Sequence, residues 1–554
     1  MKQCHQCKAG FEVAPEDLKL YDQLSPVIGG AKQPIPAPSL CPDCRNQRRL
    51  AFRNERKLYK RDCDLCKKSF ISLYSPDKPY KVYCLSCWFG DGWDPLEYGM
   101  DFDFSRPFFE QYRELLSKVP LIGSMVFSSV NCDYNSYIVD SKDCYMSVRI
   151  EGEDVFYSYL AVKCTNCVDG YNNYKCELCY ECIDCWNCYN CDYSQLCKNC
   201  SDCYFCYDCI GCKNCFGSVG LRNKEYYFFN QPYSKEEYER KVAEYKKGSF
   251  VTLKHIKKAA DAALLSKPHR ANYIFQSENV FGDFISESKD VYNSYDVEKA
   301  DVVRHSMGVE YSKIICDSNF IYYGENCYEN IGNAGGSNIR FSFAAIAGVY
   351  NLLYSMLCVN SSHDCFGSLS LKHQEYCILN KKYSKEEYEA LLPKIIEHMR
   401  QAGEWGEFFP VPLSTFYYNE SVAQQYYPLS KEEALARGFA WKDEDARGAD
   451  QAYYQVPDRI ADIPDSILKE TLGCSDCGRS YKIVAKELDF YRKKGLSVPR
   501  LCPDCRYRRR KKQRTPPKLW DRKCDNCSAN IQTSYSPDRP EIVYCEQCYL
   551  KEVY

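Results

Sequence analysis

The stretch from Cys164 to Cys215 reads CTNCVDGYNNYK, CELCYECIDCWN, CYNCDYSQLCKN, CSDCYFCYDCIG and CKNC when it is written in rows of twelve residues. Cysteine fills the first and fourth places of every row, and the two other places in the same rhythm hold cysteine or mostly small residues. Self-similarity at a fixed short period is typical of a solenoid. The sequence therefore predicts a coil of twelve residues per turn.

Cysteines three residues apart impose a bend on the backbone. In a straight strand they would point to opposite faces, so a coil with every sulfur inward must turn a corner between neighbouring cysteines. Four sides of three residues give a narrow tube that admits only small side chains. Cysteine suits such a tube because it is a small apolar residue that is usually buried. Stacked turns would lie about 4.8 Å apart.

Three states of the central thiols remain open at this stage. They can form a reduced core, bind zinc or an iron–sulfur cluster, or form disulfides between turns, since the expected Cα separation lies within the disulfide range. The C-x2-C-x2-C spacing resembles that of bacterial ferredoxins, but the x3-C-P ending is missing. An iron–sulfur cluster is therefore the less favoured metal alternative.

Each end of the chain carries four CxxC pairs. Two such pairs supply the four thiolates that zinc binds in a tetrahedron, and Leu40–Arg45 (LCPDCR) recurs as Leu501–Arg506 with the same spacing to the next pair. We expect a double zinc-ribbon module at each end and about four zinc ions per chain. The predicted ligands are Cys4, Cys7, Cys41, Cys44, Cys63, Cys66, Cys84, Cys87, Cys474, Cys477, Cys502, Cys505, Cys524, Cys527, Cys545 and Cys548.

In each module, a basic cluster lies between the second and the third CxxC pair. Residues 45–61 hold eight lysines or arginines, and residues 506–523 hold ten. Such clusters are typical of phosphate binding, although a solvated basic helix is the alternative reading. The residues predicted to contact RNA or DNA are Arg45, Arg48, Arg49, Arg53, Arg56, Lys57, Arg506, Arg508, Arg509, Arg510, Lys511, Lys512 and Arg514.

A second coil is expected about 150 residues after the first. The sequence Tyr233–Glu239 (YSKEEYE) returns as Tyr383–Glu389, and Ser-x-x-Glu within it is a capping box that predicts a helix closing each coil. Val280, Val291, Val302, Ile314 and Cys327 are the expected inward residues of the second coil.

The predicted fold class is mostly β with short helices: two β-solenoid segments of about twelve-residue rhythm flanked by zinc-ribbon modules. The expected domains are a double zinc-ribbon module, 1–95; a helical connector, 96–128; the cysteine-rich solenoid with its capping helix, 129–250; a linker helix, 251–270; the second solenoid with its capping helix, 271–402; a connector, 403–470; and the second double zinc-ribbon module, 471–554.

Composition and the remaining motifs restrict the function. The 554 residues carry a net charge of −2, and the basic ends contrast with a mildly acidic middle. The first residues lack the layout of a signal peptide and no apolar run is long enough for a membrane span, so a reducing cytoplasm is expected. There is no phosphate-binding loop, dinucleotide fingerprint or HExxH motif. We assign no catalytic residue and lean against an enzyme.

Several further motifs carry a family resemblance. LCPDCR, the two YSKEEYE segments, YYPLSKEEALARGFAW at 426–441 and PDRPEIVYCEQCY at 537–549 resemble a family of cysteine-rich, double-zinc-ribbon proteins without an assigned activity, common in candidate-phylum bacteria with very small cells. The resemblance covers essentially the full chain and implies a bacterial source but no mechanism.

Three functions follow as hypotheses. The first is a non-catalytic zinc scaffold whose basic ends bind nucleic acid or a nucleoprotein. The second is metal binding or thiol redox chemistry in the cysteine-lined coil, and the third is a structural solenoid that contacts protein partners.

Overall fold

The computed structural model describes residues 1–322, 324–346, 348–443 and 453–554. The chain forms two compact units, each built from two separate stretches of sequence. Unit 1 combines Met1–Ser124 with Asn272–Asp443, and unit 2 combines Met125–Ala271 with the described part of Glu444–Tyr554. Each terminal Cys-rich module thus shares a unit with a coil that is distant in sequence.

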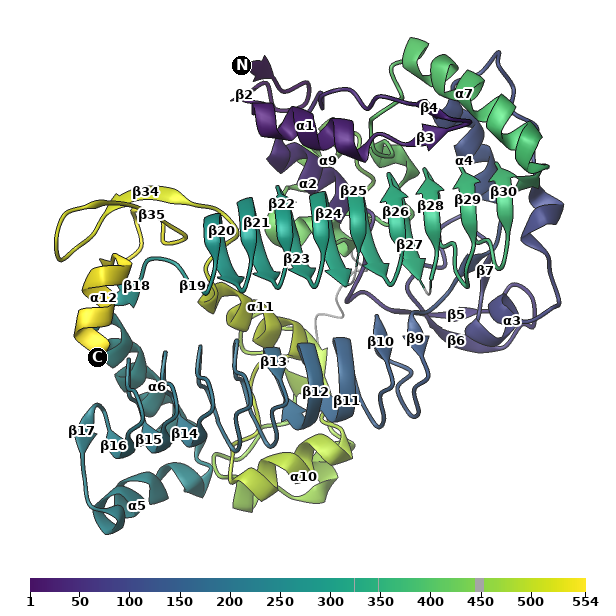
Figure 1. Ribbon diagram of the computed structural model, residues 1–554. Helices are drawn as coiled ribbons and strands as arrows, with labels where there is room; N and C mark the ends of the chain where they lie inside the picture. The colour runs from purple at the N-terminus through teal and green to yellow at the C-terminus, as the bar shows by residue number, and fades with distance from the viewer. Residues whose placement is uncertain (323, 347, 444–452) are drawn as a thin grey trace. The chain divides into compact units, whose positions relative to one another are not determined.

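The core of unit 2 is a stack of parallel strands and bridges, here called the cysteine stack (residues 126–228; Figure 1). Cys203 pairs with Cys215, and Thr165 pairs with Glu177, so the register advances by twelve residues over most of the stack. Near its start, Val148 pairs with Tyr159 across eleven. The strands of the stack are β9 (Val126–Phe127), β10 (Ile138–Val139), β11 (Val148–Phe156), β12 (Tyr159–Val168), β13 (Tyr171–Tyr174), β14 (Ser201–Tyr204), β15 (Lys213–Phe216) and β16 (Glu225–Phe228).

The backbone of the cysteine stack bends at every third residue. From Tyr157 to Phe229, each third residue has a positive φ, between 46° and 71°. This left-handed conformation turns the chain between two short extended segments, and Asn and Asp tolerate it better than most residues. The corner that the cysteine spacing required is therefore present, and many of the corner residues are Asn or Asp.

The cysteines of the stack form a buried core of thiols. None of the 38 cysteines is in a disulfide, and the cysteines from Cys164 to Cys215 are each at most 2% exposed. Each thiol points to backbone carbonyl groups: Cys167 Sγ lies 3.1 Å from the oxygen of Cys176, and Cys182 Sγ lies 3.1 Å from the oxygen of Cys191. Sulfhydryl donors thus meet carbonyl oxygens of the following turn.

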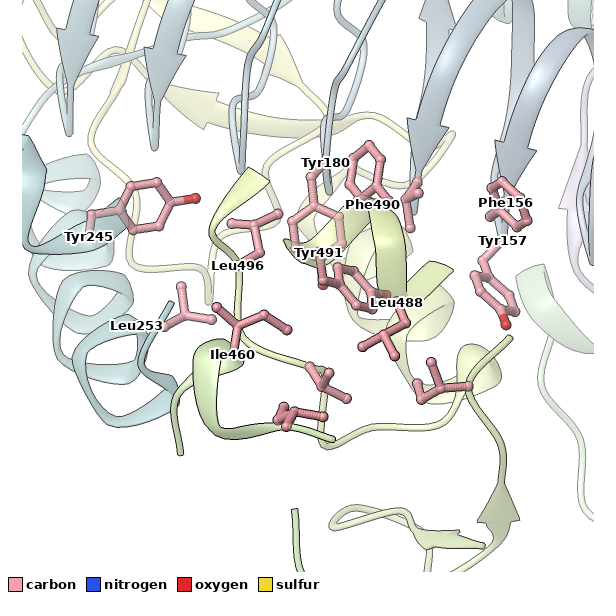
Figure 2. Packing of buried hydrophobic residues seen from close by; sticks show 14 of the residues in the cluster. Phe156, Tyr157, Tyr180, Tyr245, Leu253, Ile460, Leu488, Phe490, Tyr491 and Leu496 are labelled. Atoms are coloured by element: carbon pink, nitrogen blue, oxygen red, sulfur yellow. The ribbon is translucent and has the colours of Figure 1, made fainter. Parts of the chain in front are cut away.

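One flank of the cysteine stack is covered by helices of unit 2. Figure 2 shows Tyr180 of the stack facing Tyr491 and Phe490 of α10 (Ala485–Lys494), with ring centroids 5.6 and 6.2 Å apart. The same cluster continues to Tyr245 and Leu253. The other elements of unit 2 are β17 (Gln231–Pro232), α5 (Lys235–Ala243), α6 (Phe250–Leu265), β18 (His269–Arg270), β32 (Leu472–Gly473), β33 (Ser480–Tyr481), α11 (Pro503–Gln513), β34 (Trp520–Lys523), β35 (Asn530–Thr533), β36 (Val543–Tyr544) and α12 (Glu546–Val553).

Unit 1 contains a second stack of parallel strands (residues 274–378; Figure 1). Most of its rungs also span twelve residues, but Ile339 pairs with Leu352, and Leu352 with Cys365, across thirteen. Its strands are β19 (Ile274–Phe275), β20 (Glu278–Ser286), β21 (Lys289–Glu298), β22 (Asp301–Arg304), β23 (Met307–Glu310), β24 (Lys313–Tyr322), β25 (Glu325–Ala334), β26 (Ser337–Arg340), β27 (Phe343–Ile346), β28 (Tyr350–Leu353), β29 (His363–Phe366) and β30 (Glu375–Ile378).

The inward column of the second stack differs from the predicted one at two positions. Val280 pairs with Val291 across eleven residues, before a register shift, and Ile315 pairs with Cys327 across twelve. Val302 and Ile314 are corner residues with φ of 56°, and the following Val303 and Ile315 are fully buried. The prediction was one residue out because apolar side chains occupy both the corner and the inward position.

Helices close the C-terminal ends of both stacks. α5 and α7 (Lys385–Gln401) begin with the predicted capping boxes at Ser234 and Ser384. The remaining elements of unit 1 are β1 (Lys2–Gln3), β2 (Gly10–Phe11), α1 (Pro15–Leu24), β3 (Val27–Ile28), β4 (Ala31–Lys32), α2 (Pro42–Leu50), β5 (Tyr59–Asp62), β6 (Ser69–Ser72), β7 (Val82–Tyr83), α3 (Leu85–Phe89), α4 (Phe108–Lys118), β8 (Leu121–Ile122), β31 (Lys381–Lys382), α8 (Ala423–Tyr426) and α9 (Lys431–Ala436).

The prediction of a mostly β chain with short helices and Cys4 clusters at both ends is confirmed. The boundaries of the seven expected domains stay a prediction. In the described part of the chain, no helix has the length and apolar character needed to cross a membrane.

Candidate metal centres and the docked basic helices

All sixteen predicted metal ligands lie in four clusters of four cysteines. They are Cys4, Cys7, Cys41 and Cys44; Cys63, Cys66, Cys84 and Cys87; Cys474, Cys477, Cys502 and Cys505; and Cys524, Cys527, Cys545 and Cys548. Within each cluster the four sulfur atoms lie within 4.8 Å of one another. The structure brings the sixteen cysteines together in the four groups that the sequence predicted. Their role as metal ligands stays a prediction.

The sulfur spacing fits a tetrahedral metal ion. The Sγ atoms of Cys7 and Cys41 are 3.7 Å apart, and those of Cys477 and Cys502 are 3.8 Å apart. A tetrahedron with zinc–sulfur bonds of about 2.3 Å has sulfur atoms about 3.8 Å apart, whereas a disulfide bond is about 2.05 Å long. The residues present therefore fit a Cys4 zinc ion.

Backbone N–H groups prepare the first thiol of each cluster for metal binding. Cys84 N–H donates to Cys63 Sγ at 3.3 Å, and Cys545 N–H donates to Cys524 Sγ at 3.2 Å. Burial raises the pKa of these thiols, but backbone N–H donors outweigh it and lower the pKa of Cys63 to about 7 and that of Cys524 to about 6. The thiolate is the form that binds zinc, so these positions favour the binding form.

The four clusters share one local fold, which differs from the expected zinc ribbon. In each, the first pair lies in the turn of a two-stranded hairpin. The second pair begins a helix, because Cys41, Cys84, Cys502 and Cys545 are the N-cap residues of α2, α3, α11 and α12. A ribbon would place the second pair on another hairpin. The helix N-terminus adds a favourable dipole for thiolates.

Residues 470–514 match a model of a probable treble clef domain. The match spans the first cluster of the C-terminal module and helices α10 and α11. Searches of curated proteins and of solved structures returned no match for the chain. A hairpin followed by a helix that carries the second cysteine pair agrees with this description.

The basic helix of the treble-clef-like C-terminal module is docked on the cysteine stack. Arg506 and Arg510 share the carboxylate of Asp169, with nitrogen–oxygen distances of 3.1 and 2.5 Å, and all three side chains are at most 1% exposed. Arg509 pairs with Glu181. These arginines therefore neutralise carboxylates of the chain itself.

The N-terminal module docks on the second stack in the same manner. Arg45 and Arg49 share Asp317, at 2.9 and 3.3 Å, and Arg48 pairs with Glu329 at 2.7 Å. Burial opposes ionisation of Asp317, but the two arginines outweigh it and lower the pKa of this carboxyl. Figure 1 shows α2 beside β24 and β25, which carry the two acidic residues.

The two interfaces repeat each other position by position. In each helix the arginines occupy the first, fourth and fifth residues after the last cysteine of its first cluster, so they lie on one helical face. Their acidic partners are Asp169 and Glu181 in one stack and Asp317 and Glu329 in the other, twelve residues apart in both. All four acidic residues are corner residues with positive φ. One recognition pattern is thus used twice.

A fourth contact distinguishes the two interfaces. In unit 2, Arg514 Nε lies 2.7 Å from Asp184. In unit 1, the equivalent Arg53 pairs with Glu55 of its own module at 2.6 Å. The residue equivalent to Asp184 is Gly332, where a Cβ atom would lie 2.8 Å from Arg53 Nη1. The carboxylate therefore comes from the stack in one unit and from the module in the other.

The remaining residues of the predicted nucleic-acid set lie outside these interfaces. Arg508 and Lys512 are exposed, and Arg56, Lys57 and Lys511 are partly exposed. The sequence prediction identified the arginines but missed their acidic partners. An acidic pair twelve residues apart at the same place in both stacks was the signal that could have revealed them.

Proposed function

We propose that this protein is a non-catalytic, zinc-dependent scaffold in which each terminal module is locked onto a stack. The doubled arginine–carboxylate interface carries this proposal, because it gives the basic clusters a structural role within the chain. Loss of one partner of a buried ion pair destabilises the fold, because it leaves the other charge buried without compensation. Each module and its stack therefore depend on one another.

Both stacks are β-solenoids in this proposal. The parallel register of twelve residues and the left-handed corner at every third residue support that reading. The buried thiols of the first solenoid serve as its core, since their sulfurs meet carbonyl groups and the described residues contain no fifth metal cluster. The absence of disulfides among the cysteines favours a reducing cytoplasm.

Zinc is the proposed ion of all four centres. Four thiolates in a tetrahedron are the ligands that structural zinc prefers, and zinc supplies folding energy to modules too small to form a large core. The chain's own contribution is to hold four thiolates at the required spacing and to lower the pKa of the first thiol of each cluster.

Metal analysis tests the scaffold proposal. We expect about four zinc ions per native chain, a sharp fall in Tm on treatment with a zinc chelator, and rapid reaction of the sixteen terminal thiols only after chelation. The solenoid thiols should react only on unfolding. Visible absorbance from an iron–sulfur cluster, or metal well above four ions per chain, would support metal binding by the cysteine solenoid and contradict the proposal.

Nucleic-acid binding remains a second candidate, in a reduced form. It is favoured by the exposed Arg508 and Lys512 on the basic helix α11. Retention of RNA at low salt that declines steeply with added salt would support it. Retention unchanged in Arg508→Gln/Lys512→Gln protein, or unaffected by salt, would contradict a role for this surface.

A further inference from the structure

A cavity of about 600 Å³ lies in unit 2 between the cysteine stack, α6 and the C-terminal module. Its volume is within the range of pockets that hold small molecules. Cys474, a residue of the third cysteine cluster, contributes to its wall. The proposed scaffold function does not use it.

Aromatic rings line much of this cavity. Tyr180 and Tyr193 come from neighbouring turns of the stack, with ring centroids 5.2 Å apart. A Cβ atom on Gly473 would lie 2.4 Å from the Tyr453 ring, so only glycine lets that ring approach the wall. The six aromatic lining residues are Tyr180, Tyr193, Phe250, Tyr453, Tyr454 and Tyr481. Tyr180 and Tyr481 are buried, so the ring surface open to the cavity comes from the partly exposed Tyr193, Phe250, Tyr453 and Tyr454. Exposed aromatic surface of this kind stacks on planar ligands.

Cations outnumber carboxylates around the same cavity. Lys257 Nζ and Arg509 both face Glu181, at 3.8 Å in the case of Lys257. Asp261, one turn further along α6, interacts with Lys257 at longer range. Arg500 donates to the backbone oxygens of Val456 and Pro457, at 3.1 and 2.6 Å. Within the described chain, no carboxylate forms an ion pair with Arg500.

The positive charge at Lys257 is held at a cost. Burial lowers the pKa of Lys257 to about 8, although Glu181 acts in the opposite direction. An anion in the cavity would relieve this cost, because it would add a second negative charge near the ammonium group.

We propose that this cavity binds a planar aromatic anion of the nucleoside monophosphate class. The partly exposed rings stack on the base, and Lys257 and Arg500 receive the phosphate. The ligand is either a free mononucleotide or the phosphorylated end of a nucleic-acid strand, which present the same chemistry.

Calorimetry on the full-length, zinc-loaded protein tests the proposal. The probes are AMP, GMP, CMP and UMP, with adenosine and inorganic phosphate as partial ligands. We expect at least one monophosphate to bind with a Kd below about 1 mM, and both partial ligands to bind at least about tenfold more weakly. Absence of binding by all four monophosphates, or equal binding of adenosine, would overturn the proposal.

Matched variants on one helix locate the binding. Lys257→Gln should weaken binding of the monophosphate at least about tenfold, the effect of losing a charge-assisted contact. Lys258→Gln removes the same charge from an exposed position that does not line the cavity, and binding should be unchanged. Equal loss in both variants would show a diffuse charge effect and refute the site.

A short oligonucleotide distinguishes the two ligand sources. A 5′-phosphorylated hexanucleotide that binds more tightly than the mononucleotide, and loses affinity in Lys257→Gln, assigns the cavity to strand ends. Mononucleotide binding without oligonucleotide binding assigns it to free nucleotides. Oligonucleotide binding that is insensitive to Lys257→Gln, with no mononucleotide binding, overturns the proposal.

Discussion

At the scale of single residues, one buried carboxylate in each unit serves two arginines. Asp169 holds Arg506 and Arg510, and Asp317 holds Arg45 and Arg49. A buried carboxylate with two guanidinium partners is well compensated, whereas a buried arginine without one is not. These two aspartates therefore connect each module to its stack.

We predict that Asp169→Asn destabilises unit 2 by about 3–5 kcal/mol, the usual cost of breaking a buried ion pair from one side. The substitution keeps the shape of the side chain and removes its charge. Thermal or urea unfolding measures the effect. Glu153→Gln, which removes the exposed partner of Lys142, is the control and should leave stability unchanged; a similar loss in both variants would contradict the prediction.

Glu181 gives the acid dependence of the C-terminal interface. Burial opposes its ionisation, but Lys257 and Arg509 outweigh burial and lower the pKa of Glu181 to about 2. Because this folded-state pKa lies below the ordinary value of 4.5, the carboxylate stabilises the fold above about pH 4.5. That stabilisation, about 3 kcal/mol, is lost as the pH falls towards 2.

Comparison with Glu181→Gln isolates this contribution. The wild type should exceed the variant in unfolding free energy at about pH 5–6, and the difference should shrink as the pH falls from about 5 to 2. Both proteins carry the same metal centres, so acid release of metal affects them alike. A difference that stays constant, or grows in acid, would contradict the sign.

At the scale of elements, the turn of the cysteine stack could be predicted because its geometry follows from a short repeat. Cysteines three residues apart require a corner in the backbone. The corner is present at every third residue, as at Asn166, which has a positive φ. The docking of α11 could not be predicted in the same way, because it depends on Asp169 and Glu181, more than 300 residues earlier in the chain. A repeat within one stretch of sequence predicts the structure of that stretch. A basic segment and a distant acidic segment appear in the sequence as two separate charge patterns, and nothing in either shows that they pair.

The second stack shows a different limit of sequence reasoning. Val302 and Val303 are both apolar, so the pattern alone does not tell which one points inward. The left-handed φ of Val302 turns the chain there and leaves Val303 for the core. The terminal clusters had no such ambiguity because cysteine spacing alone specifies the ligands.

The rungs of the cysteine stack should tolerate serine better than a larger apolar residue. Cys206 lies twelve residues from both Ser194 and Ser218, and its N–H donates to Ser194 Oγ at 3.3 Å. Ser194 Oγ also lies 3.2 Å from the oxygen of Cys203, the contact that the thiols make elsewhere. The column therefore already accepts hydroxyl groups.

We predict that Cys206→Ser changes stability by less than about 1 kcal/mol, whereas Cys206→Leu costs about 1–3 kcal/mol or more because the tube is overpacked. Unfolding by urea measures both variants. Cys327→Val, in the aliphatic column of the second stack, is the matched control and should be mild, since its neighbour Ile315 is already β-branched. A severe loss in Cys206→Ser would indicate that this sulfur has a role beyond packing.

At the scale of the whole molecule, the shared arginine–carboxylate contacts do not by themselves distinguish one stack from the other. The fourth contact makes the difference. Arg514 needs Asp184, which the second stack replaces with Gly332, while Arg53 already has Glu55. We infer that this position assigns each module to its own stack.

A double-mutant cycle tests that assignment. Arg514→Gln and Asp184→Asn should each destabilise unit 2, and the pair should show a coupling of about 1–3 kcal/mol. The exposed pair Arg106 and Glu110 provides a control cycle without resolvable coupling. Additive effects of Arg514→Gln and Asp184→Asn would remove this contact as the distinguishing one.

The interleaved order of the two units has a consequence for the nascent chain. Domains fold from the N-terminus as synthesis proceeds, and α2 leaves the ribosome before the acidic residues of either stack. Asp169 is synthesised next, 148 residues before Asp317. The first acidic surface that α2 can meet is therefore that of the cysteine stack, which binds α11 in the folded protein. α11 is translated after both stacks. If α2 docks on the surface of Asp169 during synthesis, it must leave that surface before both units can form.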